Sequence, residues 1–183
     1  MRLVLLGPPG SGKGVQGAAL SRRFSVPAVS TGELLRAGAG TDGADGDERR
    51  DVADLQARGE LVPDDLVLSV INDALEAVAK GGYILDGFPR TVAQAAHSSA
   101  PPVDAAIHIE LPDDVVRERI AGRDHGRKDD NPATVERRLR RYHAETEPLL
   151  DFYRRKGLLR SVDGAQPPES VTAAILRALE PDR

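Results

Sequence analysis

Short apolar runs alternate with longer segments of helical spacing along the whole chain. The runs typical of buried strands cover residues 2–7, 26–30, 82–87, 105–111 and 157–162. Between these runs, the spacing of apolar positions predicts helices over residues 13–24, 30–38, 48–59, 63–78, 112–120, 132–153 and 169–179. Because strands and helices alternate, the pattern predicts an α/β fold in which helices cover both faces of a parallel sheet.

Several helix ends carry local signals in the sequence. Ser30 and Glu33 have the spacing of a capping box, which predicts that a helix begins there. Gly59 predicts the end of one helix, and Pro63 suits the first turn of the next. Pro148 predicts a kink or a break in the long helical segment that contains it, because proline has no amide hydrogen to donate.

The composition is typical of one domain without a membrane anchor. A chain of 183 residues is long enough for a single core. No apolar run approaches the roughly 18 residues that span a membrane, and a strand-like run begins at once, so we expect no membrane contact and no leader. The chain has no cysteine, which excludes disulfides and thiolate metal sites. We expect a cytoplasmic protein.

The charge is unevenly distributed along the chain. A net charge of −4 argues against general nucleic-acid binding. Residues 117–160, however, hold thirteen Lys and Arg against eight Asp and Glu. Such a segment is either a set of solvated helix faces or a source of anion-binding arginines, and a phosphate-binding loop elsewhere in the chain favours the second interpretation.

The segment GPPGSGKGVQ, residues 7–16, follows the first apolar run and precedes a helix. Its spacing G-x-x-x-x-G-K, from Gly7 to Lys13, is that of a loop whose backbone amides surround phosphate oxygens while the lysine reaches the outer phosphates. The hydroxyl residue that usually follows this lysine as a Mg²⁺ ligand is replaced by Gly14. Asp86, at the end of another apolar run, could instead hold a hydrated Mg²⁺ ion.

Five motifs, of which the phosphate-binding loop is the first, give the sequence a specific resemblance. GPPGSGKG, STGELLR, GELVPDDLV, LDGFPRT with the glutamine at 94, and RKDD followed by ERRLRRYH occur in this order and together resemble adenylate kinase. The resemblance implies transfer of the γ-phosphoryl group of ATP to AMP, giving two ADP. It also implies a P-loop NTPase-like core of five parallel strands flanked by helices, with a small helical excursion that binds the nucleoside monophosphate and a short lid.

On this resemblance the whole of 1–183 is one kinase domain. Its core comprises 1–29, 60–122 and 133–183, the monophosphate-binding excursion is 30–59, and the lid is 123–132. Only three residues separate Arg123 from Arg127, so the lid is a short loop without room for a folded subdomain, and without cysteine it has no thiolate zinc site. The glycine-rich and acidic stretch 38–47 is expected to be a mobile connection.

The resemblance also assigns residues to each substrate. The ATP site comprises Gly10, Ser11, Gly12, Lys13, Gly14, Val15, Arg119 and Arg123. The AMP site comprises Thr31, Arg36, Val62, Gly87, Arg90, Gln94, Arg127 and Arg138, with Thr31 and Gln94 near the base. The residues expected to act on the transferring group are Lys13, Arg90, Arg123, Arg127 and Arg138, with Mg²⁺ held by Asp86 through water.

Two alternatives remain open at this point. The first is the related UMP/CMP kinase, whose sequence resembles SAGD at the position where this chain has STGE. Thr31 and Gln94 of this chain favour AMP as the acceptor instead. A nucleotide-binding module without turnover is suggested by Val15, which stands where the family usually has threonine, although valine could also pack its methyl groups under the loop. We expect an active monomer that binds ATP and AMP, with no zinc.

Overall fold

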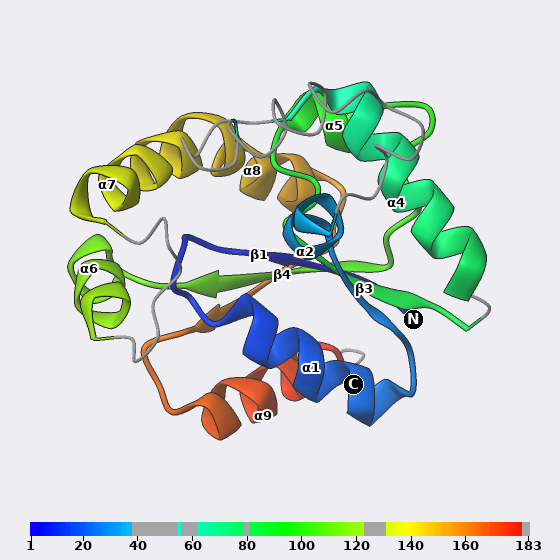
Figure 1. Cartoon of the computed structure of the whole chain (residues 1–183). Helices are drawn as coiled ribbons and strands as arrows, with labels where there is room; N and C mark the ends of the chain where they lie inside the picture. Colours follow the sequence, from blue (N-terminus) through cyan, green and yellow to red (C-terminus); the bar gives the residue numbers. More distant parts are fainter. Residues whose placement is uncertain (38–54, 56–61, 79–80, 123–130, 181–183) are drawn as a thin grey trace.

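The computed structural model describes residues 1–37, 55, 62–78, 81–122 and 131–180 (Figure 1). Within these ranges the elements follow one another as β1 (Arg2–Leu6), α1 (Lys13–Phe24), β2 (Ala28–Ser30), α2 (Thr31–Arg36), α4 (Asp64–Val78), β3 (Tyr83–Asp86), α5 (Val92–Ala96), β4 (Ala105–Glu110), α6 (Asp113–Ala121), α7 (Pro132–Arg141), a π-helical turn (Tyr142–Thr146), α8 (Pro148–Arg155), β5 (Leu159–Asp163) and α9 (Pro168–Ala178).

The five strands form one parallel sheet in the order β2-β3-β1-β4-β5. This confirms the predicted α/β class. Strands β1 to β4 lie within the predicted apolar runs, and β5 extends one residue beyond its run, to Asp163. The central strand β1 is bonded on both sides, so that Leu3 pairs with Ile84 of β3 and with Ala105 of β4. Both faces of such a strand are buried, which explains its continuous apolar sequence.

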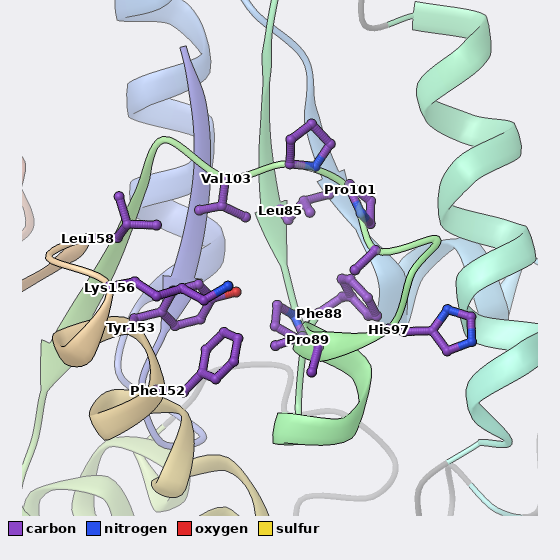
Figure 2. A pocket seen from close by; sticks show the side chains of 14 residues that line it. Leu85, Phe88, Pro89, His97, Pro101, Val103, Phe152, Tyr153, Lys156 and Leu158 are labelled. Atoms are coloured by element: carbon purple, nitrogen blue, oxygen red, sulfur yellow. The ribbon is translucent and has the colours of Figure 1, made fainter.

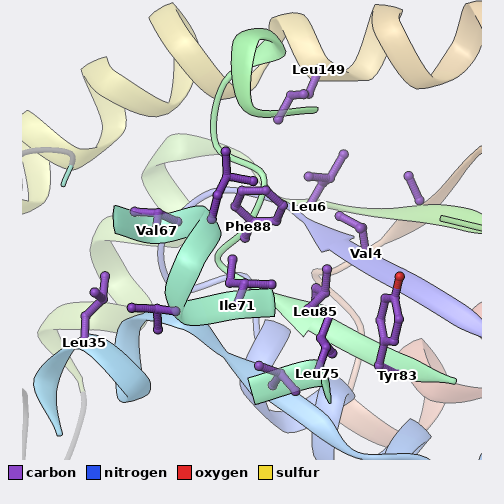
Figure 3. Close-up of a cluster of buried hydrophobic side chains, with 14 of the residues drawn as sticks. Val4, Leu6, Leu35, Val67, Ile71, Leu75, Tyr83, Leu85, Phe88 and Leu149 are labelled. Carbon is purple, nitrogen blue, oxygen red and sulfur yellow. The ribbon is translucent and has the colours of Figure 1, made fainter. Parts of the chain in front are cut away.

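Alternate residues of the strands enter two separate cores. Leu3 and Leu5 of β1 belong to a cluster with Leu20 of α1 and Ile175 of α9, on one face of the sheet. The next residues along β1 belong to the second cluster, where Leu149 of α8 and side chains of α4 pack on the other face (Figures 1 and 3). The period of two along β1 therefore gives each layer of helices its own buried surface.

Helices α6 and α7 form a smaller unit at the end of the sheet where the strands finish (Figure 1). They share a third apolar cluster that contains Val116, Ile120, Val135 and Leu139. On the outside, the Arg117 guanidinium lies 2.5 Å from the carboxylate of Glu136, and this hydrogen bond lowers the pKa of that carboxyl group. The two helices precede and follow the predicted lid.

The break predicted at Pro148 is confirmed, and its geometry is a widened helical turn. Glu147 donates its amide hydrogen to the carbonyl of Tyr142 at 2.8 Å, five residues back, and α8 begins at the proline. A proline inside a regular helix would lack the bond to the residue four positions back and would clash with that carbonyl. The π-helical turn removes this conflict while the chain continues in helical conformation.

Two local predictions need correction. Helix α2 begins after Ser30 as expected, but the Ser30 side chain makes no capping hydrogen bond, so the capping box is wrong. Ser30 also ends β2, where it pairs with Asp86, and the sheet therefore sets its extended backbone. Helix α5 was not predicted at all. The connection 38–47 lies outside the described residues, and so does the expected helix over 48–59 apart from residue 55.

None of the helices in the described ranges has the combination of length and apolar character that is needed to cross a membrane.

Candidate active site

The glycine-rich loop after β1 has a backbone that only glycine tolerates. Gly7, Gly10 and Gly12 have φ values of +146°, +80° and +92°. A Cβ at Gly7 would lie 2.6 Å from the carbonyl oxygen of Ile109, and one at Gly10 would lie 3.2 Å from the Ile120 side chain. These glycines therefore let the loop turn sharply and pack closely against β4 and α6.

Lys13, the first residue of α1, folds back over this loop. Its Nζ donates to the carbonyl oxygens of Gly7 at 2.8 Å and Pro8 at 2.9 Å, and it lies 3.5 Å from the Ser11 hydroxyl oxygen. The side chain of Ser11 is buried. The ammonium charge is thus held at the loop, next to the amino terminus of α1, and this combination suits phosphate.

Asp86 ends β3, the strand beside β1, and reaches toward the same loop. A Cβ at Gly14 would lie 3.8 Å from Asp86 Oδ2. The Asp86 carboxylate thus lies beside the position where glycine replaces the usual hydroxyl residue. The described residues contain no group of three or more His, Cys, Asp or Glu side chains that could hold a metal. A single carboxylate nevertheless fits Mg²⁺, which keeps several waters and binds through one or two carboxylates and substrate phosphates.

Val15 lies on the exposed side of α1. Its side chain is 57% exposed, so the expected packing of its methyl groups under the loop is wrong. The helix turns its buried face, which contains Gln16 and Leu20, toward the sheet and α9 instead. Residue 15 is therefore open to contact from a bound ligand.

The turn after β3 brings together residues predicted for the acceptor. Gly87 has φ +84°, and a Cβ on it would lie 3.4 Å from Arg90 Nη2 and 3.9 Å from Thr31 Cβ. Arg90 donates from Nε to the carbonyl oxygen of Gly87 at 3.0 Å. Thr31 is 2% exposed, and its hydroxyl oxygen is the single buried side-chain polar atom without a hydrogen-bond partner among the described residues. Such an atom marks a place where a ligand could bond.

Gln94 lies on α5 and is 2% exposed. Its side-chain Oε1 accepts from the Arg90 amide at 2.7 Å, and its Nε2 donates to Asp64 Oδ1 at 2.6 Å. Asp64 was not among the predicted site residues, because 30 positions separate it from Gln94. Helix α5 itself does have a signal, since Thr91 and Gln94 have capping-box spacing and the Thr91 hydroxyl oxygen accepts from the Gln94 amide.

The remaining predicted residues are spread over several elements. Arg119 on α6 donates to the carbonyl oxygen of Ala165 at 3.1 Å, and Arg138 lies half-buried on α7. Val62 is buried just before α4, and Arg36 is the last residue of α2. Arg123 and Arg127 lie outside the described residues.

A separate cavity of about 250 Å³ lies between α5, the segment before β4 and the end of α8 (Figure 2). Its lining includes Phe88, Pro101, Phe152 and Tyr153, and Lys156 Nζ lies 4.4 Å from the centre of the Phe152 ring. Among the described residues, none of those predicted to bind a nucleotide lines it. This cavity therefore lies apart from the described residues to which the sequence assigns the nucleotides.

Comparisons with known proteins find matches that together cover almost the whole chain. The family model described as adenylate kinase matches residues 5–158. An adenylate kinase of Leptospira biflexa serovar Patoc is 40% identical over 187 residues, covering 97% of this chain and 99% of the relative. Adenylate kinases of Xanthomonas oryzae pv. oryzae and Xanthomonas campestris pv. campestris are each 43% identical over 188 residues, covering 98% of this chain and 99% of the relative.

Proposed function

The chain belongs to the adenylate kinase family and is an ATP:AMP phosphotransferase, and we propose that two loops at one edge of its sheet hold the two substrates. The observation that carries the assignment is the pairing of β1 with β3. The phosphate loop leaves β1 and the Gly87–Gln94 segment leaves β3, and parallel strands end at the same edge.

On the donor side, the loop amides and Lys13 would bind the phosphates of ATP. Support comes from the glycine backbone of residues 7–12 and from the position of Lys13 Nζ over the loop. Gly10, Ser11, Gly12, Gly14 and Val15 belong to the same site in this proposal, and Arg119 and Arg123 would bind the remainder of ATP.

The family uses Mg²⁺ together with ATP, and Asp86 would hold the ion through its coordinated waters. Bound there, Mg²⁺ would neutralise charge on the phosphate oxygens. The position of Asp86 Oδ2 near Gly14 supports this role.

On the acceptor side, Arg90 would bind the AMP phosphate, with Arg36 as its partner, and Thr31 and Gln94 would contact the base. The orphaned Thr31 hydroxyl supports this assignment because a purine could supply the missing hydrogen bond. Val62 and Gly87 would complete the pocket through their backbones. The same two base-side residues favour AMP over the pyrimidine acceptors of UMP/CMP kinase.

The transfer needs charge neutralisation more than proton transfer. The second pKa of a phosphate monoester is about 6, so the attacking oxygen of AMP is already deprotonated at neutral pH and no general base is required. The remaining task is to align two anions and stabilise the transferring group, for which planar guanidinium groups are suited. Lys13, Arg90, Arg123, Arg127 and Arg138 would perform it.

The division of the chain into core, excursion 30–59 and lid 123–132 belongs to the same proposal, as do a monomeric state and a cytoplasmic location. Light scattering on the purified protein tests the monomeric state directly, since the mass of one chain, 19.6 kDa, is expected.

Replacing Gln94 by alanine tests the assignment of the acceptor pocket. Gln94→Ala should raise KM for AMP about tenfold to hundredfold while KM for ATP changes little, because a buried hydrogen-bonding group would be lost from one pocket alone. Equal increases in both KM values would reject the assignment. Because Gln94 is buried, the melting temperature of the variant is measured in parallel.

A further inference from the structure

A continuous hydrogen-bond chain connects α4 to the segment that precedes α5. Asp64 Oδ1 accepts from Gln94 Nε2 at 2.6 Å, and Gln94 Oε1 accepts from the backbone amide of Arg90 at 2.7 Å. Gln94 is 2% exposed, whereas Asp64 is half-buried in the first turn of α4. Both ends of one buried carboxamide are thus held by groups of fixed polarity.

These two partners allow only one orientation of the carboxamide. If the amide were rotated by 180°, its NH₂ group would face the Arg90 amide hydrogen and its oxygen would face the Asp64 carboxylate. One donor would then face another donor, and one acceptor would face another acceptor. In a buried place, a polar group left unpaired in this way is costly. Arg90 contributes through its backbone, which no substitution at 90 other than proline removes, so Asp64 is the side chain that completes the restraint.

We propose that Asp64 is a specificity-determining positioning residue, which holds the Gln94 carboxamide in the orientation that accepts adenine and rejects 6-oxopurines. The inference rests on the proposed assignment of Gln94 to the base of AMP. After its two internal bonds, the carboxamide retains one N–H donor on Nε2 and one acceptor position on Oε1.

The chemistry of the base explains why the orientation matters. Adenine carries an amino donor at position 6 beside acceptor ring nitrogens, whereas a 6-oxopurine carries an acceptor at position 6. Hypoxanthine, the base of IMP, also has a hydrogen on N1, so its pattern along this edge is the reverse of adenine. A carboxamide that could rotate would adapt to either base, and one held by Asp64 cannot.

The experiment compares AMP and IMP as acceptors with ATP as the donor, using the full chain. The natural protein, Asp64→Ala and the matched control Asp65→Ala are assayed for kcat/KM with each acceptor. Asp65 is the next residue in the same helical turn and is exposed, so its substitution removes the same charge without touching Gln94. Asp64→Ala should reduce the preference for AMP over IMP by about tenfold or more, with KM for ATP unchanged, whereas Asp65→Ala should keep the natural preference.

Two further variants make each outcome decisive. Asp64→Asn retains a side-chain acceptor for Gln94 Nε2 and should restore most of the preference, which a merely structural role of the charge would not do. Asp64→Ser, too short to reach Gln94, replaces the alanine variant if that variant does not fold. An unchanged AMP-to-IMP ratio in Asp64→Ala, together with a collapsed ratio in Gln94→Ala, would overturn the role of Asp64 alone. An unchanged ratio in both variants would overturn the assignment of Gln94 and this inference with it.

Discussion

Substitution of Val15 by threonine separates an active kinase from a silent nucleotide-binding module. Val15 is the third residue of α1 and is 57% exposed. Threonine has the same branched shape, so the substitution opens no cavity and buries no hydroxyl group. Exposed substitutions of this kind change the free energy of unfolding by no more than about 0.5 kcal/mol. Any large change in rate must therefore come from contact with the substrates.

The magnitude follows from one hydrogen bond. A hydroxyl that donates to a charged phosphate oxygen contributes about 1.5–3 kcal/mol, which corresponds to about a tenfold to hundredfold change in rate. The glycine backbone of the loop and the Lys13 ammonium remain in the natural protein. We therefore expect the natural protein to turn over and Val15→Thr to raise kcat/KM by no more than about a hundredfold, mainly on the ATP side.

The assay measures ADP formation over a range of ATP at saturating AMP, and then the reverse. Val15→Ser supplies a hydroxyl group without the second branch of threonine. Val15→Ala removes both methyl groups of the valine branch and supplies no hydroxyl group. The serine and threonine variants should gain activity and the alanine variant should not. The reasoning fails if the natural protein binds both nucleotides but forms no ADP while Val15→Thr is fully active, since the silent-module hypothesis would then hold.

Three other predictions concern the loop, a surface histidine and metal content. Gly7→Ala should unfold or strongly destabilise the protein because its Cβ would lie 2.6 Å from a backbone oxygen, whereas Gly14→Ala, with 3.8 Å to its nearest contact, should keep the natural melting temperature or raise it; equal melting temperatures would contradict this. Hydrogen bonds to Glu147 and Asp113 raise the pKa of His143 above 6.5, so this group stabilises the fold fully below pH 6.5 and loses its contribution as pH rises through the folded-state pKa. The urea midpoint of His143→Gln should accordingly fall furthest below that of the natural protein under pH 6.5, and a gap independent of pH between 5 and 9 would refute the ion pairs. Elemental analysis of the purified protein should find no stoichiometric zinc, and one zinc per chain would contradict a short lid without thiolates.

The strands and long helices could be predicted because their signals are local. The strand β1 has an apolar sequence bounded by a glycine-rich loop, and the apolar spacing within 63–78 repeats over several turns of α4. Helix α5 escaped prediction because five residues are too few to show a period, even though the Thr91 cap was visible in the sequence. The capping box at Ser30 failed for the opposite reason, since a correct local pattern was overruled by pairing within the sheet.

Site prediction was limited by distance along the chain. The phosphate loop is a contiguous motif, so Gly7, Gly12 and Lys13 could be assigned from spacing alone. The bond between Asp64 and Gln94 joins α4 to α5 across 30 residues, and neither residue has a neighbour whose pattern points to the other. The proximity of Asp86 to Gly14 depends likewise on the pairing of β1 with β3, which sequence spacing does not specify.

The end of β3 has a particular place in the proposed arrangement, in which two consecutive residues would serve different substrates. The Asp86 side chain lies near Gly14 on the donor side, whereas the next residue, Gly87, lies beside Thr31 and Arg90 on the acceptor side. The positive φ of Gly87 makes this division possible, since it turns the chain away from the direction of the strand immediately after Asp86. The distance between the proposed donor and acceptor sites is therefore set by backbone geometry at one turn, which hydrogen bonds of β3 to both β1 and β2 hold in place. In-line transfer depends on that distance, and strands inside a sheet hold it fixed more rigidly than a surface loop could.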